Sequence, residues 1–136
     1  QVALLVGDIE QAQEQALLAQ GAALRASVLL VPHHGSRTSS SPAFVAAVAP
    51  RWAVVQAGYR NRFGHPHAQV VQRYQAVGAQ VVNTVDCGAA RWPSWQPEVL
   101  QCERVLRQRY WQHPGEHGPD PGGVLGGARA TPLPGP

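Results

Sequence analysis

The amino-acid sequence predicts an α/β fold in which short buried strands alternate with helices. Two observations support this class. Apolar runs of strand length alternate along residues 1–90 with segments whose apolar residues recur at helical spacing. Glycine, serine and proline stand between these segments, at positions that begin or end helices. This alternation is typical of helices layered on a mostly parallel sheet.

Four strands are predicted from runs rich in valine, leucine and alanine, at residues 2–6, 27–31, 52–57 and 80–84. The first strand is expected to be buried. The second strand ends at Pro32, because proline has no N–H to donate to a sheet. After the fourth strand, Asp86-Cys87-Gly88 is predicted to form a hairpin turn into a short strand at residues 89–92.

Three helices are predicted between the strands. The first spans residues 9–20 and ends at Gly21. The second has Ser41 as its N-cap and Pro42 as its first helical residue. The third starts at Pro66 and ends at Gly78. The expected apolar faces consist of Ile9, Ala12, Ala16 and Leu17 in the first helix, Phe44, Val45 and Val48 in the second, and Val70, Val71, Tyr74 and Val77 in the third.

Composition limits the function classes. The chain has 136 residues, of which 44% are hydrophobic and 14% charged, and its formal net charge of +3 does not by itself indicate nucleic-acid binding. The apolar runs are far shorter than the roughly 18 residues of a membrane span. Cys87 and Cys102 form no CxxC motif. We interpret them as free thiols, with a disulfide as the alternative in an oxidising compartment.

The chain is predicted to have three parts. Residues 1–92 form the α/β domain, and residues 93–112 form a C-terminal extension with a possible helix at 98–111. Residues 113–136 contain six prolines and seven glycines, a composition that predicts a disordered tail. The tryptophans around the extension, Trp92, Trp95 and Trp111, are interpreted as packing residues, with nucleobase stacking as the alternative.

Polar clusters follow the first three strands. Asp8, after the first, either caps the next helix or directs its carboxylate into a cleft. His33 and His34, after the second, are adjacent and therefore point in different directions. One imidazole could bind a metal while the other holds the loop or faces substrate, unless both are incidental surface residues. Ligand sites gather at the carboxyl ends of parallel strands, so these clusters are expected to meet at one edge.

The third cluster spans residues 58–67. His65 precedes a predicted helix N-terminus, where free N–H groups favour anions. Arg60 and Arg62 add positive charge, and arginine can hold a phosphate through two parallel hydrogen bonds. His67 is expected to lie in the first helical turn and to face solvent. The His65-x-His67 spacing lacks the downstream Asp-His of a full metal motif.

Together, the segments GDIE, VPHHGSRTSSS and GYRNRFGHPH, in this order, resemble the C-terminal half of the metallo-β-lactamase-like domain of ComEC-type competence proteins. These proteins take up DNA during natural transformation, and the similarity covers residues 2–92. It implies a partial αββα sandwich, of which this chain is the C-terminal half only. It also implies a site for two divalent metals, Zn²⁺ or Mn²⁺, at one edge of the sandwich.

The resemblance assigns roles to individual residues. Asp8 matches a carboxylate that bridges the two metals, and the His33-His34 pair matches a late motif in which one histidine is a ligand, with His33 preferred. His65 matches a catalytic histidine that contacts substrate or moves protons. Flanking phosphates of the DNA would be bound by Arg37, Arg60 and Arg62.

One part of the family pattern is missing. The main metal motif, His-x-His-x-Asp-His, does not occur in the 136 residues and is expected in a parent protein before Gln1, together with membrane-spanning helices. The isolated chain is therefore expected to be inactive, with an incomplete metal site.

The resemblance implies a DNase that degrades the non-transported strand. Its partners would be single-stranded or duplex DNA, the N-terminal half of the same domain and the membrane channel of the parent protein. That protein would lie in the bacterial inner membrane, with this domain outside the cytoplasm. Two alternatives stay open: a hydrolase of a small phosphoester, and a non-catalytic domain that binds DNA or partners in the uptake machinery.

Overall fold

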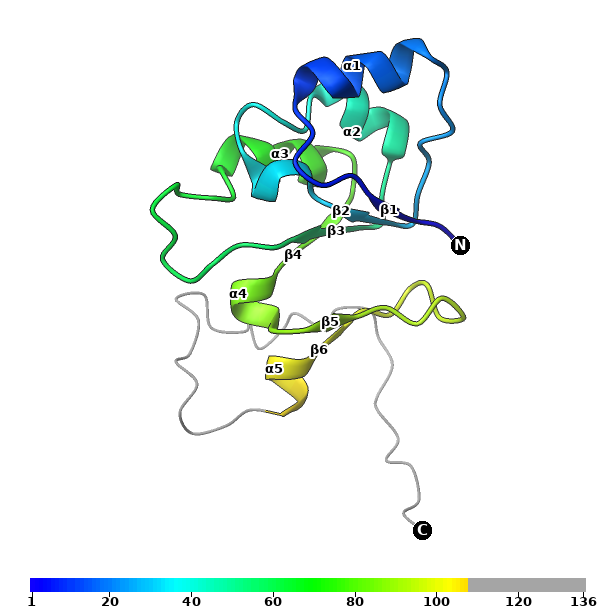
Figure 1. Ribbon diagram of the computed structural model, residues 1–136. Coiled ribbons are helices and arrows are strands. Elements are labelled where there is room, and N and C mark those ends of the chain that lie inside the picture. Colours follow the sequence, from blue (N-terminus) through cyan, green and yellow to red (C-terminus); the bar gives the residue numbers. More distant parts are fainter. Residues whose placement is uncertain (108–136) are drawn as a thin grey trace.

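The computed structural model describes residues 1–107 and confirms the predicted α/β class. Four parallel strands form one sheet in chain order: β1 (Ala3–Leu5), β2 (Val28–Leu30), β3 (Trp52–Val55) and β4 (Gln80–Asn83). The helices that connect them, α1 (Gln11–Ala19), α2 (Pro42–Val48) and α3 (Ala68–Ala76), cover one face of this sheet (Figure 1). The predicted N-cap Ser41 is confirmed, since its hydroxyl accepts a hydrogen bond from Phe44 N–H.

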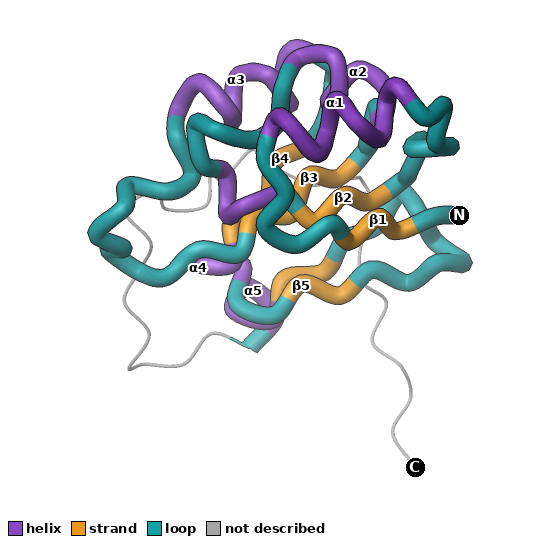
Figure 2. The backbone as a smooth tube through the Cα atoms, turned by 45° about the horizontal axis from the view of Figure 1, so that its top comes forward, coloured by secondary structure: helices purple, strands orange, loops and turns teal. Residues whose placement is uncertain are grey.

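The opposite face is covered by smaller elements (Figures 1 and 2). These are α4 (Thr84–Cys87), α5 (Glu103–Leu106) and an antiparallel pair of short strands, β5 (Ala90–Arg91) and β6 (Gln101–Cys102). The predicted hairpin at residues 86–88 is wrong: the chain makes a helical turn there, and β5 pairs with β6 instead of β4. The Asn83 side chain accepts a hydrogen bond from Val85 N–H and so caps this turn. The possible helix at residues 98–111 is reduced to α5 among the described residues.

Strand register divides the sheet residues between two cores. Leu4, Leu29, Ala53 and Val81 lie in one row across the four strands and pack toward the helices. Side chains alternate between the faces of a sheet, so the flanking rows point the other way. The buried residues of the helix-side core are Leu24, Ala26, Leu29, Val31, Phe44, Val45, Val48, Ala53, Val55, Val70, Tyr74 and Ala79.

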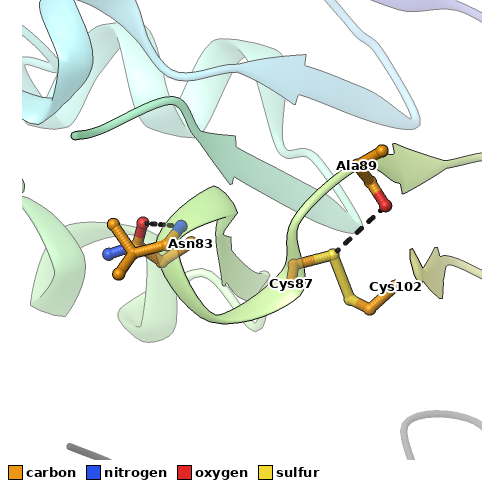
Figure 3. Close-up of a disulfide and its surroundings, with 5 residues drawn as sticks. Asn83, Cys87, Ala89 and Cys102 are labelled. Atoms are coloured by element: carbon orange, nitrogen blue, oxygen red, sulfur yellow. Dashed lines mark hydrogen bonds between the residues drawn. A yellow bond between two sulfur atoms is a disulfide. The ribbon is translucent and has the colours of Figure 1, made fainter. Parts of the chain in front are cut away.

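The second core lies under β5 and β6. Val28, Trp52 and Val54 pack there with Leu100 and with a disulfide between Cys87 and Cys102 (Figure 3). Our interpretation of the cysteines as free thiols is therefore wrong. The α4 turn and β6 bring the two Cα atoms to 4.6 Å, a separation that no sequence spacing reveals.

The first strand differs from its prediction. β1 is an edge strand that pairs only with β2 among the described residues, and Leu5 is 72% exposed. Leu5 lies in the row of Leu30 and Val54, on the second face. The covering elements extend over residues of β2, β3 and β4 and leave the β1 side of this face open.

Two helical faces are also corrected. In α1, Ala12 and Ala16 are exposed, whereas Glu14 is completely buried. The helix turns a carboxylate inward because that carboxylate accepts hydrogen bonds from backbone N–H groups of the loop between β2 and α2. The third helix begins at Ala68 instead of Pro66, with His67 as its N-cap, and Val77 at its end is 39% exposed.

Candidate metal and nucleic-acid site

The loops that follow β1, β2 and β3 meet at one edge of the sheet, as the sequence predicts. Two backbone hydrogen bonds join them. His33 N–H donates to the Gly7 carbonyl at 3.1 Å, which ties the second loop to the first. His67 N–H donates to the Gly35 carbonyl at 3.0 Å, which ties the third loop to the second. Backbone contacts thus help to set the positions of the histidines.

The His33-His34-Gly35 turn has an unusual backbone. All three residues have positive φ, at 47°, 54° and 82°. Residues with a Cβ rarely adopt a positive φ, so contacts with the surrounding residues must stabilise this turn. Gly35 cannot be replaced without a rearrangement, because an added Cβ would lie 2.7 Å from the Cβ of Pro66. The turn directs the two imidazoles to different neighbours.

His34 faces Asp8. Its Nδ1 lies 2.7 Å from the backbone carbonyl of Gln56, which can only accept a hydrogen bond. Nδ1 therefore carries the proton, and the neutral ring has its lone pair on Nε2. That atom lies 3.6 Å from Oδ1 of Asp8, and both side chains are largely exposed. A lone pair and a carboxylate oxygen thus face the same space.

His33 faces Glu10. Its buried Nδ1 lies 3.2 Å from Glu10 Oε1, an ion-pair distance without hydrogen-bond geometry. The same carboxylate oxygen accepts a hydrogen bond from the Thr38 hydroxyl at 2.8 Å. Glu10 also caps α1 together with Gln13, so Asp8 is not the cap of this helix. The carboxylate of Asp8 is thereby left for another role.

His65 joins the cluster from the third loop. Its ring centroid lies 6.1 Å from that of His33 and 5.5 Å from that of His67. Desolvation, followed by repulsion from His67, His33 and His34, lowers the pKa of His65 below 6.5. The neutral imidazole is therefore favoured near neutral pH. A proton-donating role would work against this electrostatic environment.

The three candidate arginines are not gathered in one place. Arg37 is exposed in the second loop, where its carbonyl is 3.5 Å from the Gln11 side-chain amide. Arg60 and Arg62 lie in the third loop beside aromatic rings, with Cζ 5.2 Å from the Tyr59 ring centroid and 4.9 Å from the Phe63 ring centroid, respectively. His67 is partly buried as the N-cap of α3 and does not lie inside the first turn.

A buried polar network supports the site from behind. Both carboxylate oxygens of Glu14 accept backbone N–H groups, one from Ser40 and one from Ser41. Ser40 Oγ lies 2.8 Å from the Tyr74 hydroxyl, and Arg73 donates to the carbonyls of Ser39 and Ser40. Burial is the main cause that raises the pKa of Tyr74. The serine run therefore serves this network besides the Ser41 cap, and the sequence pattern gave no sign of the partner, Glu14.

The residues present suit a divalent metal in chemistry but not in number. Carboxylate oxygen and imidazole nitrogen are ligands of Zn²⁺ and Mn²⁺. The Nδ1 bond of His34 to a carbonyl is the contact that commonly orients a metal-binding histidine. Within residues 1–107, however, no three histidine, cysteine, aspartate or glutamate side chains gather around a common point that could hold an ion. The edge thus offers part of a site.

Several bacterial proteins are similar to this chain. It is 36% identical over 110 residues to competence protein ComA of Neisseria gonorrhoeae, an overlap of 80% of this chain and 16% of that protein. It is 35% identical over 89 residues to ComE operon protein 3 of Bacillus subtilis, an overlap of 65% and 12%. It is 36% identical over 88 residues to recombination protein 2 of Haemophilus influenzae, an overlap of 65% and 11%.

The similarity relates the chain to proteins named for competence and recombination, and the chain spans less than a fifth of their length. No protein-family model matches the sequence. No solved structure matches it either. Among residues 1–107, no helix has the length and hydropathy that a membrane span requires.

Proposed function

We propose that this chain forms the C-terminal half of a metal-dependent DNase domain, of the αββα metallo-β-lactamase-like type, in a protein that takes up DNA during natural transformation. The names of the relatives support the role in competence. The observation that carries the chemistry is the pair formed by Asp8 Oδ1 and His34 Nε2, 3.6 Å apart at the edge of a parallel sheet. This pair would form part of a site for two divalent ions, Zn²⁺ or Mn²⁺.

His34 is the better ligand of the histidine pair. Its Nδ1 proton is held by the Gln56 carbonyl, so its Nε2 lone pair is available beside Asp8. The Nδ1 of His33 instead lies 3.2 Å from the Glu10 carboxylate without hydrogen-bond geometry, so His33 lacks the bond that orients the His34 ring. We therefore assign metal binding to His34 and a positioning role to His33, in place of the preference for His33 that the resemblance gave.

The remaining ligands would come from the N-terminal half of the domain. An αββα sandwich needs a second sheet against the first, and Leu5 is exposed on the face of β1 that lacks a cover. That side of the sheet is suited to pack against another part of the protein. Completion of the domain would bury this apolar surface and supply the missing donors in one step.

When bound, two divalent ions offset the charge on the attacking and leaving oxygens of a phosphodiester. Asp8 and His34 would fix the ions relative to the ends of β1 and β2. Arg37, Arg60 and Arg62 would bind phosphates that flank the scissile bond, through paired N–H groups. His65, which lies beside His33 and His67, would contact the substrate near the scissile bond.

The disulfide supports a location outside the cytoplasm. Disulfides form and persist in oxidising compartments and are rare where thiol reductants are abundant. The Cys87–Cys102 bond lies in the second core, where it joins α4 to β6. We therefore propose that the domain faces the periplasm or the cell exterior, in a protein anchored in the inner membrane. DNA entering through a membrane channel would reach this side first.

Metal titration of the 136-residue chain tests the half-site. Calorimetry with Mn²⁺ or Zn²⁺ should show weak binding that Asp8→Asn and His34→Ala weaken by about tenfold or more. His67→Ala, a histidine outside the pair, serves as the matched control and should bind as the unmodified chain does. Equal loss in His33→Ala and none in His34→Ala would reverse the assignment within the pair. Submicromolar binding of two ions would contradict the idea of an incomplete site.

Cells that carry the same substitutions in the complete gene test the biological role. Asp8→Asn should stop the release of nucleotides from incoming labelled DNA, and Glu98→Gln at the surface should leave it unchanged. Normal nucleotide release in Asp8→Asn cells that still take up DNA would favour the non-catalytic binding role. Unchanged transformation together with altered hydrolysis of a small phosphodiester would favour the small-substrate hydrolase.

A further inference from the structure

The loop between β3 and α3 carries two exposed aromatic rings. Tyr59 is 53% exposed and Phe63 is 60% exposed. Neither residue belongs to the two buried cores. Exposed aromatic rings at this density in one loop are a common feature of binding surfaces. We call residues 58–65 the aromatic loop.

The aromatic loop is ordered by its own hydrogen bonds. The Asn61 side-chain amide donates to the carbonyls of Gly58 and His65, at 3.1 and 2.7 Å. Its side-chain oxygen accepts the His65 N–H at 2.9 Å. Gly64, with φ of 66°, turns the chain back toward His65. Asn61 thus binds both ends of the loop, so the two rings stand on a backbone that is held by hydrogen bonds.

Each ring has a guanidinium over one of its faces. Arg60 Cζ lies 5.2 Å from the Tyr59 centroid, and Arg62 Cζ lies 4.9 Å from the Phe63 centroid. Aromatic faces and guanidinium planes both stack on nucleobases, and the same guanidinium groups attract phosphates. A ligand that matches this alternation has flat unsaturated rings linked by anionic groups. Single-stranded nucleic acid has this chemistry, whereas duplex DNA hides its base faces.

The aromatic loop is continuous with the candidate metal site. The Phe63 ring stacks on the His65 ring with centroids 5.7 Å apart and planes 26° apart. His65 in turn lies beside His33. A strand held on the loop would therefore run directly toward the sheet edge where Asp8 and His34 face each other.

We infer that the aromatic loop is a stacking platform for unpaired nucleobases, with Tyr59 and Phe63 as the stacking residues, so that the site takes single-stranded DNA in preference to duplex DNA. This inference rests on the proposed function, because the proposed DNase activity is what makes DNA the ligand. The stacking itself needs no metal and no catalysis.

Fluorescence anisotropy with the 136-residue chain in EDTA tests the platform separately from the metal site. The probes are a labelled oligothymidine, the same length of abasic sugar-phosphate, and a duplex. The oligothymidine should bind about tenfold or more tightly than the abasic strand, the scale of stacking for one or two bases. The duplex should bind no better than the abasic strand. Equal affinity for all three probes would overturn the inference.

Paired variants keep the test decisive. The double variant Tyr59→Ala, Phe63→Ala should lose the advantage of oligothymidine over the abasic strand, while Tyr59→Phe keeps it. Trp95→Ala removes an aromatic ring that is 80% exposed outside the aromatic loop and should change nothing. Equal loss with Trp95→Ala, or no loss in the double variant, would contradict the assignment. If anionic vesicles compete fully and the double variant loses vesicle binding alone, the loop is a membrane contact instead.

The outcomes separate the two proposals. Oligothymidine binding that survives Asp8→Asn in EDTA supports the platform even if the metal titration fails. Loss of metal binding in Asp8→Asn with no preference for unpaired bases supports the metal site and rejects the platform.

Discussion

The two faces of the central sheet are covered by different means. On the helix side, α1, α2 and α3 bury a broad set of aliphatic and aromatic side chains, and Glu14 ties two of these helices together. On the other side, short strands and single-turn helices cover the rows of Val28 and Val54, and a disulfide joins the covering elements. Burial on the first face is extensive, and on the second it is thin.

This contrast indicates how each face gains its stability. Helices of two turns or more bring whole apolar stripes to a sheet, so packing alone can hold them. Elements of two to four residues bury little surface, and a covalent bond that limits the unfolded chain makes up part of the difference. We therefore expect the helix side to respond mainly to cavities and the other side mainly to reduction.

The largest effect should come from a cavity on the helix side. Phe44 is completely buried in α2, and Phe44→Ala should lower the free energy of unfolding by about 3–5 kcal/mol, from lost transfer energy plus the cavity. Denaturant unfolding followed by circular dichroism measures this loss. Ala46→Ser, at an exposed position of the same helix, is the control and should cost only about 0.5 kcal/mol. A loss below about 1 kcal/mol for Phe44→Ala would mean that this face is not tightly packed.

The disulfide should matter next. The bond closes a loop with a sequence separation of 15, for which the chain-entropy model gives about 3 kcal/mol. The double variant Cys87→Ser, Cys102→Ser should lose about this amount. Trp52 and Trp92 both donate their indole N–H to the Pro97 carbonyl in the covering segment. In the double variant, tryptophan fluorescence should therefore change at a lower denaturant concentration than the circular dichroism signal of the helices. If both signals change together at the midpoint of the original chain, the contrast between the two faces is wrong.

A smaller loss is expected from the buried carboxylate. Glu14→Gln keeps the size of the side chain but removes the charge that accepts the N–H groups of Ser40 and Ser41. We expect a loss of about 1.5–3 kcal/mol, the range for hydrogen bonds to charged groups. Gln15→Glu, exposed on the same helix, tests the effect of charge alone. If Glu14→Gln unfolds at the same denaturant concentration as the original chain, the network contributes specificity rather than stability.

The smallest effect should come from Tyr74, through its hydroxyl. Tyr74→Phe removes the bond to Ser40 and should cost about 1 kcal/mol. The pKa of Tyr74 is raised above 10.0, mainly by burial, so the folded state keeps a proton that the unfolded state loses. The stability that this proton contributes is complete below pH 10 and falls as the pH rises above it. Stability measured at rising alkaline pH should fall less steeply in Tyr74→Phe; equal slopes would show that Tyr74 does not titrate as described.

The sequence predicts the strands better than the surfaces they present. The runs at residues 27–31 and 52–57 are strongly apolar and lie in the middle of the sheet, so local pattern and tertiary burial agree. The run at residues 2–6 is equally apolar but forms an edge strand, and its burial depends on what covers it rather than on its own residues. Helical spacing in α1 likewise could not reveal that Glu14 would point inward, since its partners are backbone N–H groups 26 and 27 residues away.

The candidate site follows the same division. The meeting of three loops at one edge follows from the parallel strand order, which the alternation of elements already implies. The choice between His33 and His34 does not, because it depends on which ring faces the Gln56 carbonyl and which faces Glu10. Those directions are set by a turn with positive φ at His33, His34 and Gly35, which two adjacent histidines in a sequence do not predict. The disulfide could not be predicted for the same reason, since it depends on the pairing of β5 with β6, two strands that are separated in the sequence.

The order of the strands has a consequence for the order in which the chain can fold. β1, β2, β3 and β4 lie side by side in the order in which they are made, and each connecting helix covers the same face (Figure 1). No strand has to be inserted between two earlier ones, so every new strand finds its neighbour already in place as the chain emerges. The disulfide joins Cys87 to Cys102, both of which follow the last strand of the sheet. A disulfide between these two residues therefore becomes possible only after all four strands of the sheet have been made.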